Sequence, residues 1–109
     1  MRGVFVIVYL RAPRGDRRAV RAAYRRISWV NEAVPGLLRA ELLTDEADPD
    51  RMALLSEWVD LPAFRAWQSG PDHEGGKKNS ALRDYQDRSH GPHYVVYRQD
   101  GVDDADRPA

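Results

Sequence analysis

The first strand that the sequence predicts, residues 3–11, has apolar side chains on both of its faces. One face carries Val4, Val6, Val8 and Leu10, and the other carries Phe5, Ile7 and Tyr9. A strand that is apolar on both faces is typical of the middle of a sheet, with cover on both sides. A turn containing Pro and Gly follows over residues 12–15.

A helical spacing of apolar residues replaces this alternation over residues 16–34. The apolar stripe consists of Val20, Ala23, Ile27, Val30 and Val34. Asp16 precedes the stripe, where an Asp side chain can accept a hydrogen bond from a free backbone N–H group. Pro35 and Gly36 then end the predicted helix.

The second half of the chain predicts a hairpin, two further helical segments and a last strand. Strands at 37–44 and 52–59 flank a polar turn, and Asp60 and Pro62 begin a helix. Helical character is weaker over 71–85 because of two adjacent glycines, and firmer over 81–88. The last strand is expected at 93–98.

This order, β-α-β-β-α-β, predicts an α+β ferredoxin-like fold: a four-stranded antiparallel sheet with helices on one face. We expect one domain over residues 1–99 and an acidic, disordered tail over residues 100–109. Because the first strand is apolar on the uncovered face as well, a second copy of the chain is the expected cover, and we expect a homodimer.

Composition narrows the classes of function. The 109 residues include no Cys, which excludes disulfides, thiol catalysis and Cys-ligated metals. Residues 1–40 hold nine Arg and two acidic residues, although the whole chain has zero net charge. We interpret these arginines as a solvated helix face, and expect no nucleic acid partner.

The apolar run at the N-terminus is too short to span a membrane, so we expect a cytoplasmic protein.

Candidate chemistry is concentrated at the corner between the third strand and the next helix. Trp58, Phe64 and Trp67 could stack on a flat aromatic substrate, or could fill the core between sheet and helices. His73 follows a Ser-Gly-Pro-Asp loop and could serve as a base near neutral pH. Tyr9 is the preferred polar residue for such a cavity.

Four other tyrosines could also reach a cavity: Tyr24, Tyr85, Tyr94 and Tyr97. His90 and His93 are separated by Gly91 and Pro92 and lack acidic neighbours, so we expect no metal site. The sequence contains no phosphate-binding Gly loop, nucleophile elbow or zinc motif. We therefore expect no cofactor.

Three short motifs resemble the antibiotic biosynthesis monooxygenase-type domains, a group of dimeric α/β-barrel proteins. They are Pro35-Gly36-Leu37, Ser56-Glu57-Trp58, and Ala63-Phe64 with Trp67 and Ser69, followed by His73. The resemblance covers residues 3–98. It implies a dimeric barrel and one of several roles, because the group includes cofactor-independent oxygenases that turn polycyclic phenols into quinones, haem-degrading enzymes and small proteins of unproved role.

The sequence departs from both enzyme branches. Trp58 matches a Trp of the quinone-forming oxygenases, but Leu54 and Phe64 stand where those enzymes have Asn and Tyr. In the haem-degrading branch Trp67 has a counterpart, whereas Lys77 replaces the His that ligates iron. Resemblance to that branch is therefore the weaker one.

Together these features predict a cofactor-independent monooxygenase that acts on an aromatic polyketide-like or phenolic intermediate in bacterial secondary metabolism. We expect the substrate to contact Trp58, Phe64, Trp67 and Leu54, with His73 and Tyr9 as the catalytic residues. A cyclase or isomerase using the same pocket is the first alternative. A ligand-binding accessory protein without turnover is the second.

Overall fold

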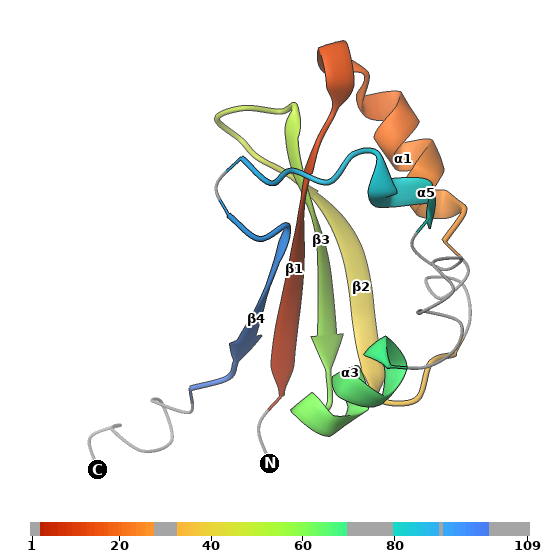
Figure 1. Ribbon diagram of the computed structural model, residues 1–109, viewed down its shortest axis with the longest axis vertical. Coiled ribbons are helices and arrows are strands. Elements are labelled where there is room, and N and C mark those ends of the chain that lie inside the picture. The colour runs from red at the N-terminus through yellow and green to blue at the C-terminus, as the bar shows by residue number, and fades with distance from the viewer. Residues whose placement is uncertain (1–2, 28–32, 70–79, 90, 101–109) are drawn as a thin grey trace.

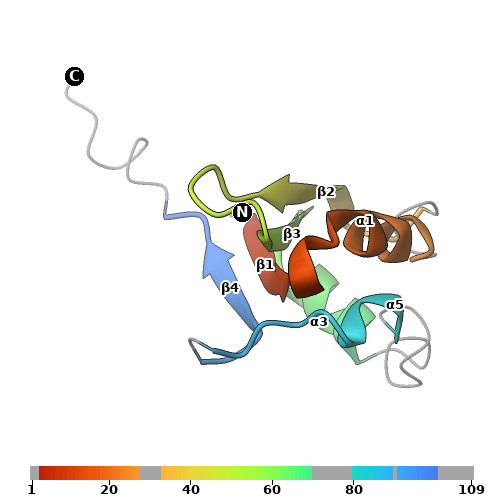
Figure 2. The same ribbon diagram turned by 90° about the horizontal axis from the view of Figure 1, so that it is seen from above.

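The computed structural model describes residues 3–27, 33–69, 80–89 and 91–100. Four antiparallel strands form one sheet: β1 (Val4–Arg11), β2 (Leu37–Thr44), β3 (Arg51–Trp58) and β4 (Tyr94–Arg98). The strand order is β2-β3-β1-β4, so β1 lies in the middle, as its two apolar faces predict. The described helices lie on one side of the sheet (Figures 1 and 2). The ferredoxin-like fold predicted from the sequence is confirmed.

The helical elements are η1 (Pro13–Gly15), α1 (Arg17–Arg25), α3 (Leu61–Gln68) and α5 (Ser80–Arg83). Both predicted N-caps are confirmed. The Asp16 carboxylate accepts a hydrogen bond from the Ala19 backbone at 3.2 Å, and the Asp60 carboxylate accepts one from Ala63 at 2.8 Å. In the part of the chain that the structure describes, no helix combines the length and the apolar character needed to cross a membrane.

The first helix ends earlier than predicted. It ends at Arg25, and the Arg26 N–H group is shared between the carbonyl oxygens of Ala22 and Ala23 at 3.3 and 3.2 Å. Ile27 then leaves the helix and is 1% exposed in the core. Its burial beside Val20 and Ala23 agrees with the predicted apolar stripe, although the helix ends two residues before it. Residues 28–32, which include Trp29, lie outside the described residues.

The predicted helix over residues 81–88 is wrong beyond Arg83. The backbone carbonyl of Tyr85 accepts a hydrogen bond from the Arg11 N–H group, and the Asp87 N–H group donates one to Tyr9, both at 2.8 Å. Because β4 pairs with β1 only as far as Val8, the last residues of β1 have free backbone groups at this edge. The segment after α5 satisfies them in place of further helix.

Two groups of buried side chains lie between the sheet and the helices. Near α1 and α5 they are Leu10, Ala12, Val20, Ala23, Ile27, Met52, Leu54 and Leu82. Near α3 they are Val4, Val6, Trp58 and Phe64. Side chains alternate along β3, so that Leu54, Ser56 and Trp58 all face the helices. The side chains of these three residues therefore lie between β3 and α3.

Candidate functional site

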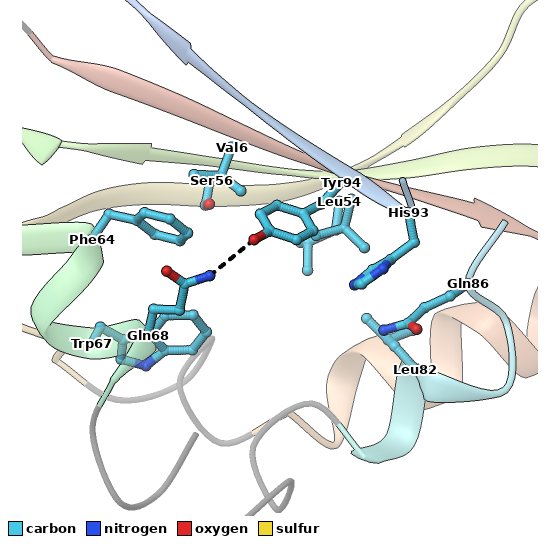
Figure 3. A pocket seen from close by; sticks show the side chains of 11 residues that line it. Val6, Leu54, Ser56, Phe64, Trp67, Gln68, Leu82, Gln86, His93 and Tyr94 are labelled. Carbon is cyan, nitrogen blue, oxygen red and sulfur yellow. Dashed lines mark hydrogen bonds between the residues drawn. The ribbon is translucent and has the colours of Figure 1, made fainter. Parts of the chain in front are cut away.

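A small cavity of about 80 Å³ lies between the sheet and the helices α3 and α5 (Figure 3). Its walls come from all three regions: Val6 and Val8 of β1, Leu54 and Ser56 of β3, Phe64, Trp67 and Gln68 of α3, Leu82 of α5, Gln86, and His93 and Tyr94 at the start of β4. Three of the four residues predicted to contact substrate, Leu54, Phe64 and Trp67, therefore line one cavity.

One end of the cavity is aromatic. Phe64 and Trp67 are three residues apart on α3 and so share a helix face, with their ring centroids 6.3 Å apart. Behind them lies Trp58, whose ring meets Phe64 edge-on at 5.6 Å and lies 5.5 Å from Trp67. Trp58 is 0% exposed and is not part of the cavity wall. Trp58 therefore lies behind the cavity wall, against Phe64 and Trp67, and its substrate contact stays a prediction.

Trp58 nevertheless acts on the cavity through a neighbour. Its indole Nε1–H group donates a hydrogen bond to the Ser56 hydroxyl oxygen at 3.0 Å. Ser56 is 5% exposed and lines the cavity. It was not among the candidate residues, although its position two residues before Trp58 on the inward face of β3 was a usable signal.

The other end of the cavity is polar. The Gln68 side-chain amide donates a hydrogen bond to the Tyr94 hydroxyl at 3.1 Å, which joins α3 to β4 (Figure 3). His93 lies beside Tyr94, with ring centroids 5.0 Å apart, and Gln86 lies nearby. Burial lowers the pKa of His93 below its ordinary value, and the positive charge of Arg88 lowers it further. A lowered pKa favours the neutral imidazole, which is the form that can accept a proton.

Tyr9 is not brought into this cavity. The residues of β1 that line it are Val6 and Val8, and alternation places Tyr9 on the opposite face of the sheet. There the pKa of the Tyr9 hydroxyl is raised by burial and also by the neighbouring Tyr97. The other predicted catalytic residue, His73, lies outside the described residues and stays a prediction.

The position of His93 and Tyr94 depends on long-range pairing that sequence spacing does not show. Tyr94 pairs with Val8 in the β1–β4 ladder, and that pairing sets both residues at the cavity. The described residues contain no group of three or more His, Asp or Glu side chains that could hold a metal ion. His90 lies outside them.

The sequence matches a known protein family and one curated relative. A family model described as antibiotic biosynthesis monooxygenase matches residues 3–79, which is more than half of the chain. Protein SchA of Streptomyces halstedii is 30% identical over 96 residues, covering 88% of this chain and 25% of SchA. The chain thus spans about a quarter of the length of that curated relative.

Solved structures of low sequence identity share the fold. SnoaB of Streptomyces nogalater, a cofactor-independent oxygenase, superposes with a TM-score of 0.59 at 18% identity, covering 90% of this chain and 88% of SnoaB. Protein SO0527 of Shewanella oneidensis superposes with a TM-score of 0.65 at 17% identity, covering 90% of this chain and 91% of that protein.

Proposed function

Because the chain belongs to the antibiotic biosynthesis monooxygenase family, we propose that it is a cofactor-independent monooxygenase acting on an aromatic, polyketide-like or phenolic intermediate. The observation that carries this proposal is the cavity with Phe64 and Trp67 at one end and His93 at the other. The description of SnoaB as a cofactor-independent oxygenase supports it. The proposed setting is bacterial secondary metabolism in the cytoplasm.

The proposed reaction uses the electrons of the substrate itself. Deprotonation of a phenol gives an electron-rich phenolate that reduces O₂ directly. One oxygen atom enters the ring as a carbonyl, and the other leaves as water together with the two hydrogens that the phenol loses. The protein supplies a dry cavity, orientation of the ring and a base. In this proposal Phe64 and Trp67 stack on the ring, and His93 accepts the phenol proton.

Oxygen uptake tests the proposal. We expect the purified protein, treated with a chelator, to consume O₂ with at least one member of a series of one-ring to four-ring phenols. Uptake should need neither flavin nor metal and should fall with Trp67→Ala, which removes one aromatic wall. Leu38→Ala is the matched control, because Leu38 is 59% exposed and lies outside the cavity. Absence of uptake with the whole series would contradict the proposal.

A cyclase or isomerase is the second candidate, and two residues of the cavity favour it. Leu54 and Phe64 give apolar side chains where the quinone-forming oxygenases have Asn and Tyr, while His93 could still transfer a proton within a substrate. Incubation under nitrogen distinguishes the two candidates, since a new product without O₂ identifies the cyclase. Tight binding of an unchanged ligand would identify an accessory protein instead.

We also propose that the protein is a homodimer formed through the sheet face opposite the helices. Its apolar side chains include Phe5, Ile7, Leu55 and Val95, each half-buried in a single chain, and Tyr97, which is 54% exposed. Burial of such a patch against its own copy removes apolar area from water.

Sedimentation equilibrium tests the dimer. At micromolar concentration we expect a mass twice that of one chain. Ile7→Glu should reduce it to that of one chain, because a carboxylate would then be buried in the apolar interface of each chain. Arg65→Glu, at an exposed position of α3 on the other side of the sheet, should leave the mass unchanged. A wild-type protein with the mass of one chain would overturn the proposal.

A further inference from the structure

The hydroxyl group of Ser56 accepts a hydrogen bond but has no described acceptor for its own proton. It is 5% exposed, and its oxygen accepts the hydrogen bond of the Trp58 indole. Within the described residues, the structure gives the Ser56 hydroxyl proton no acceptor. Figure 3 shows the Ser56 oxygen pointing toward the cavity between Phe64 and Tyr94.

Trp58 fixes the role of this hydroxyl. An indole N–H group can only donate, so Ser56 must be the acceptor in their hydrogen bond. The Trp58 ring is held by Phe64 and Trp67 at centroid distances of 5.6 and 5.5 Å, which keeps the donor in place. The Ser56 O–H group is therefore left to donate, and a buried donor without an acceptor is unfavourable.

We infer that Ser56 is the hydrogen-bond donor to an oxygen atom of the substrate, and that the cavity selects aromatic molecules with a carbonyl or phenolate oxygen over those without one. This inference rests on the proposed function, because it treats the cavity as the substrate site. The neighbours of Ser56 on the cavity floor, Val6, Val8 and Leu54, offer only apolar side chains. A substrate oxygen placed there has Ser56 as its partner.

Binding of a matched pair of probes tests the inference without turnover. The probes are 1-tetralone and tetralin, which share a bicyclic frame and differ by one carbonyl oxygen. Their affinities are measured by NMR titration of the indole N–H signals. Ser56→Ala should weaken binding of 1-tetralone by about five- to tenfold, the usual worth of one hydrogen bond. Binding of tetralin should stay unchanged.

A double variant guards against a loss of folding. Ser56→Ala leaves the Trp58 N–H group buried without its acceptor, whereas Ser56→Ala with Trp58→Phe removes both partners of the bond. The double variant should show the same selective loss for 1-tetralone. Equal affinity of wild type and both variants for 1-tetralone would overturn the inference and leave the proposed function standing. Binding of neither probe by the wild type would overturn both.

Discussion

His93→Gln is expected to lower kcat for phenol oxidation by at least about 100-fold, the usual contribution of a general base. Gln keeps a polar side chain of similar reach but cannot accept the phenol proton at neutral pH. The imidazole lies in the cavity wall beside Tyr94, where burial lowers its pKa. Because tetralin has no proton to give to His93, its affinity should change far less than kcat does. Steady-state oxygen uptake and NMR titration measure the two quantities.

The pH dependence of the rate of oxygen uptake tests the role of His93 as the base more specifically. Burial and the Arg88 charge lower the pKa of His93, so the group gains its proton only below its ordinary value of ~6.5. The wild-type rate should therefore fall as the pH decreases through that lowered value. Arg88→Gln removes the nearby charge and should move the acid limb to higher pH without lowering the plateau. An unchanged limb in His93→Gln would assign the base to another residue.

Trp58→Ala is expected to lower the free energy of unfolding by about 3–5 kcal/mol, the usual cost of removing a buried Trp ring. Trp58 is 0% exposed and contacts both aromatic rings of the cavity wall. A small domain has only about 5–15 kcal/mol of stability in total, so this variant should be close to unfolding at 37 °C. Urea denaturation followed by circular dichroism measures the loss.

Two further variants separate core packing from a general effect of substitution. Trp58→Phe keeps most of the ring and should lose less stability than Trp58→Ala. Leu38→Ala, at a position that is 59% exposed, should change stability by less than about 0.5 kcal/mol. If Trp58→Ala were as stable as the wild type, the ring would belong to an open pocket, and its placement behind the wall would be wrong.

Local signals in the sequence were enough for the frame of the fold. Alternation gave β1 its central place, and the capping residues Asp16 and Asp60 gave the starts of α1 and α3. The ends of the helices needed tertiary information. The segment at Tyr85 pairs with the edge of β1 in place of further helix. This long-range contact is not visible in helical spacing.

The candidate site was predictable only in part. The spacing of Phe64 and Trp67 on one helix face pointed to the aromatic wall. Alternation along β1 already places Tyr9 on the face opposite Val6 and Val8. That alternation was a better guide to the position of Tyr9 than the presence of its hydroxyl group. His93 and Tyr94 depend on pairing between strands that are far apart in the chain, and this register has no local signature.

The pairing of β1 with β4 also limits how early the sheet can be completed while the chain is being synthesised. Val4 pairs with Arg98, so one edge of β1 stays open on the ribosome until nearly the whole described chain has emerged. Contacts between such distant residues form slowly, because a long loop must close first. The hairpin of β2 and β3 can form earlier, from neighbouring residues. The wall that carries His93 and Tyr94 can therefore form only after β4 has emerged, later than the β2–β3 hairpin.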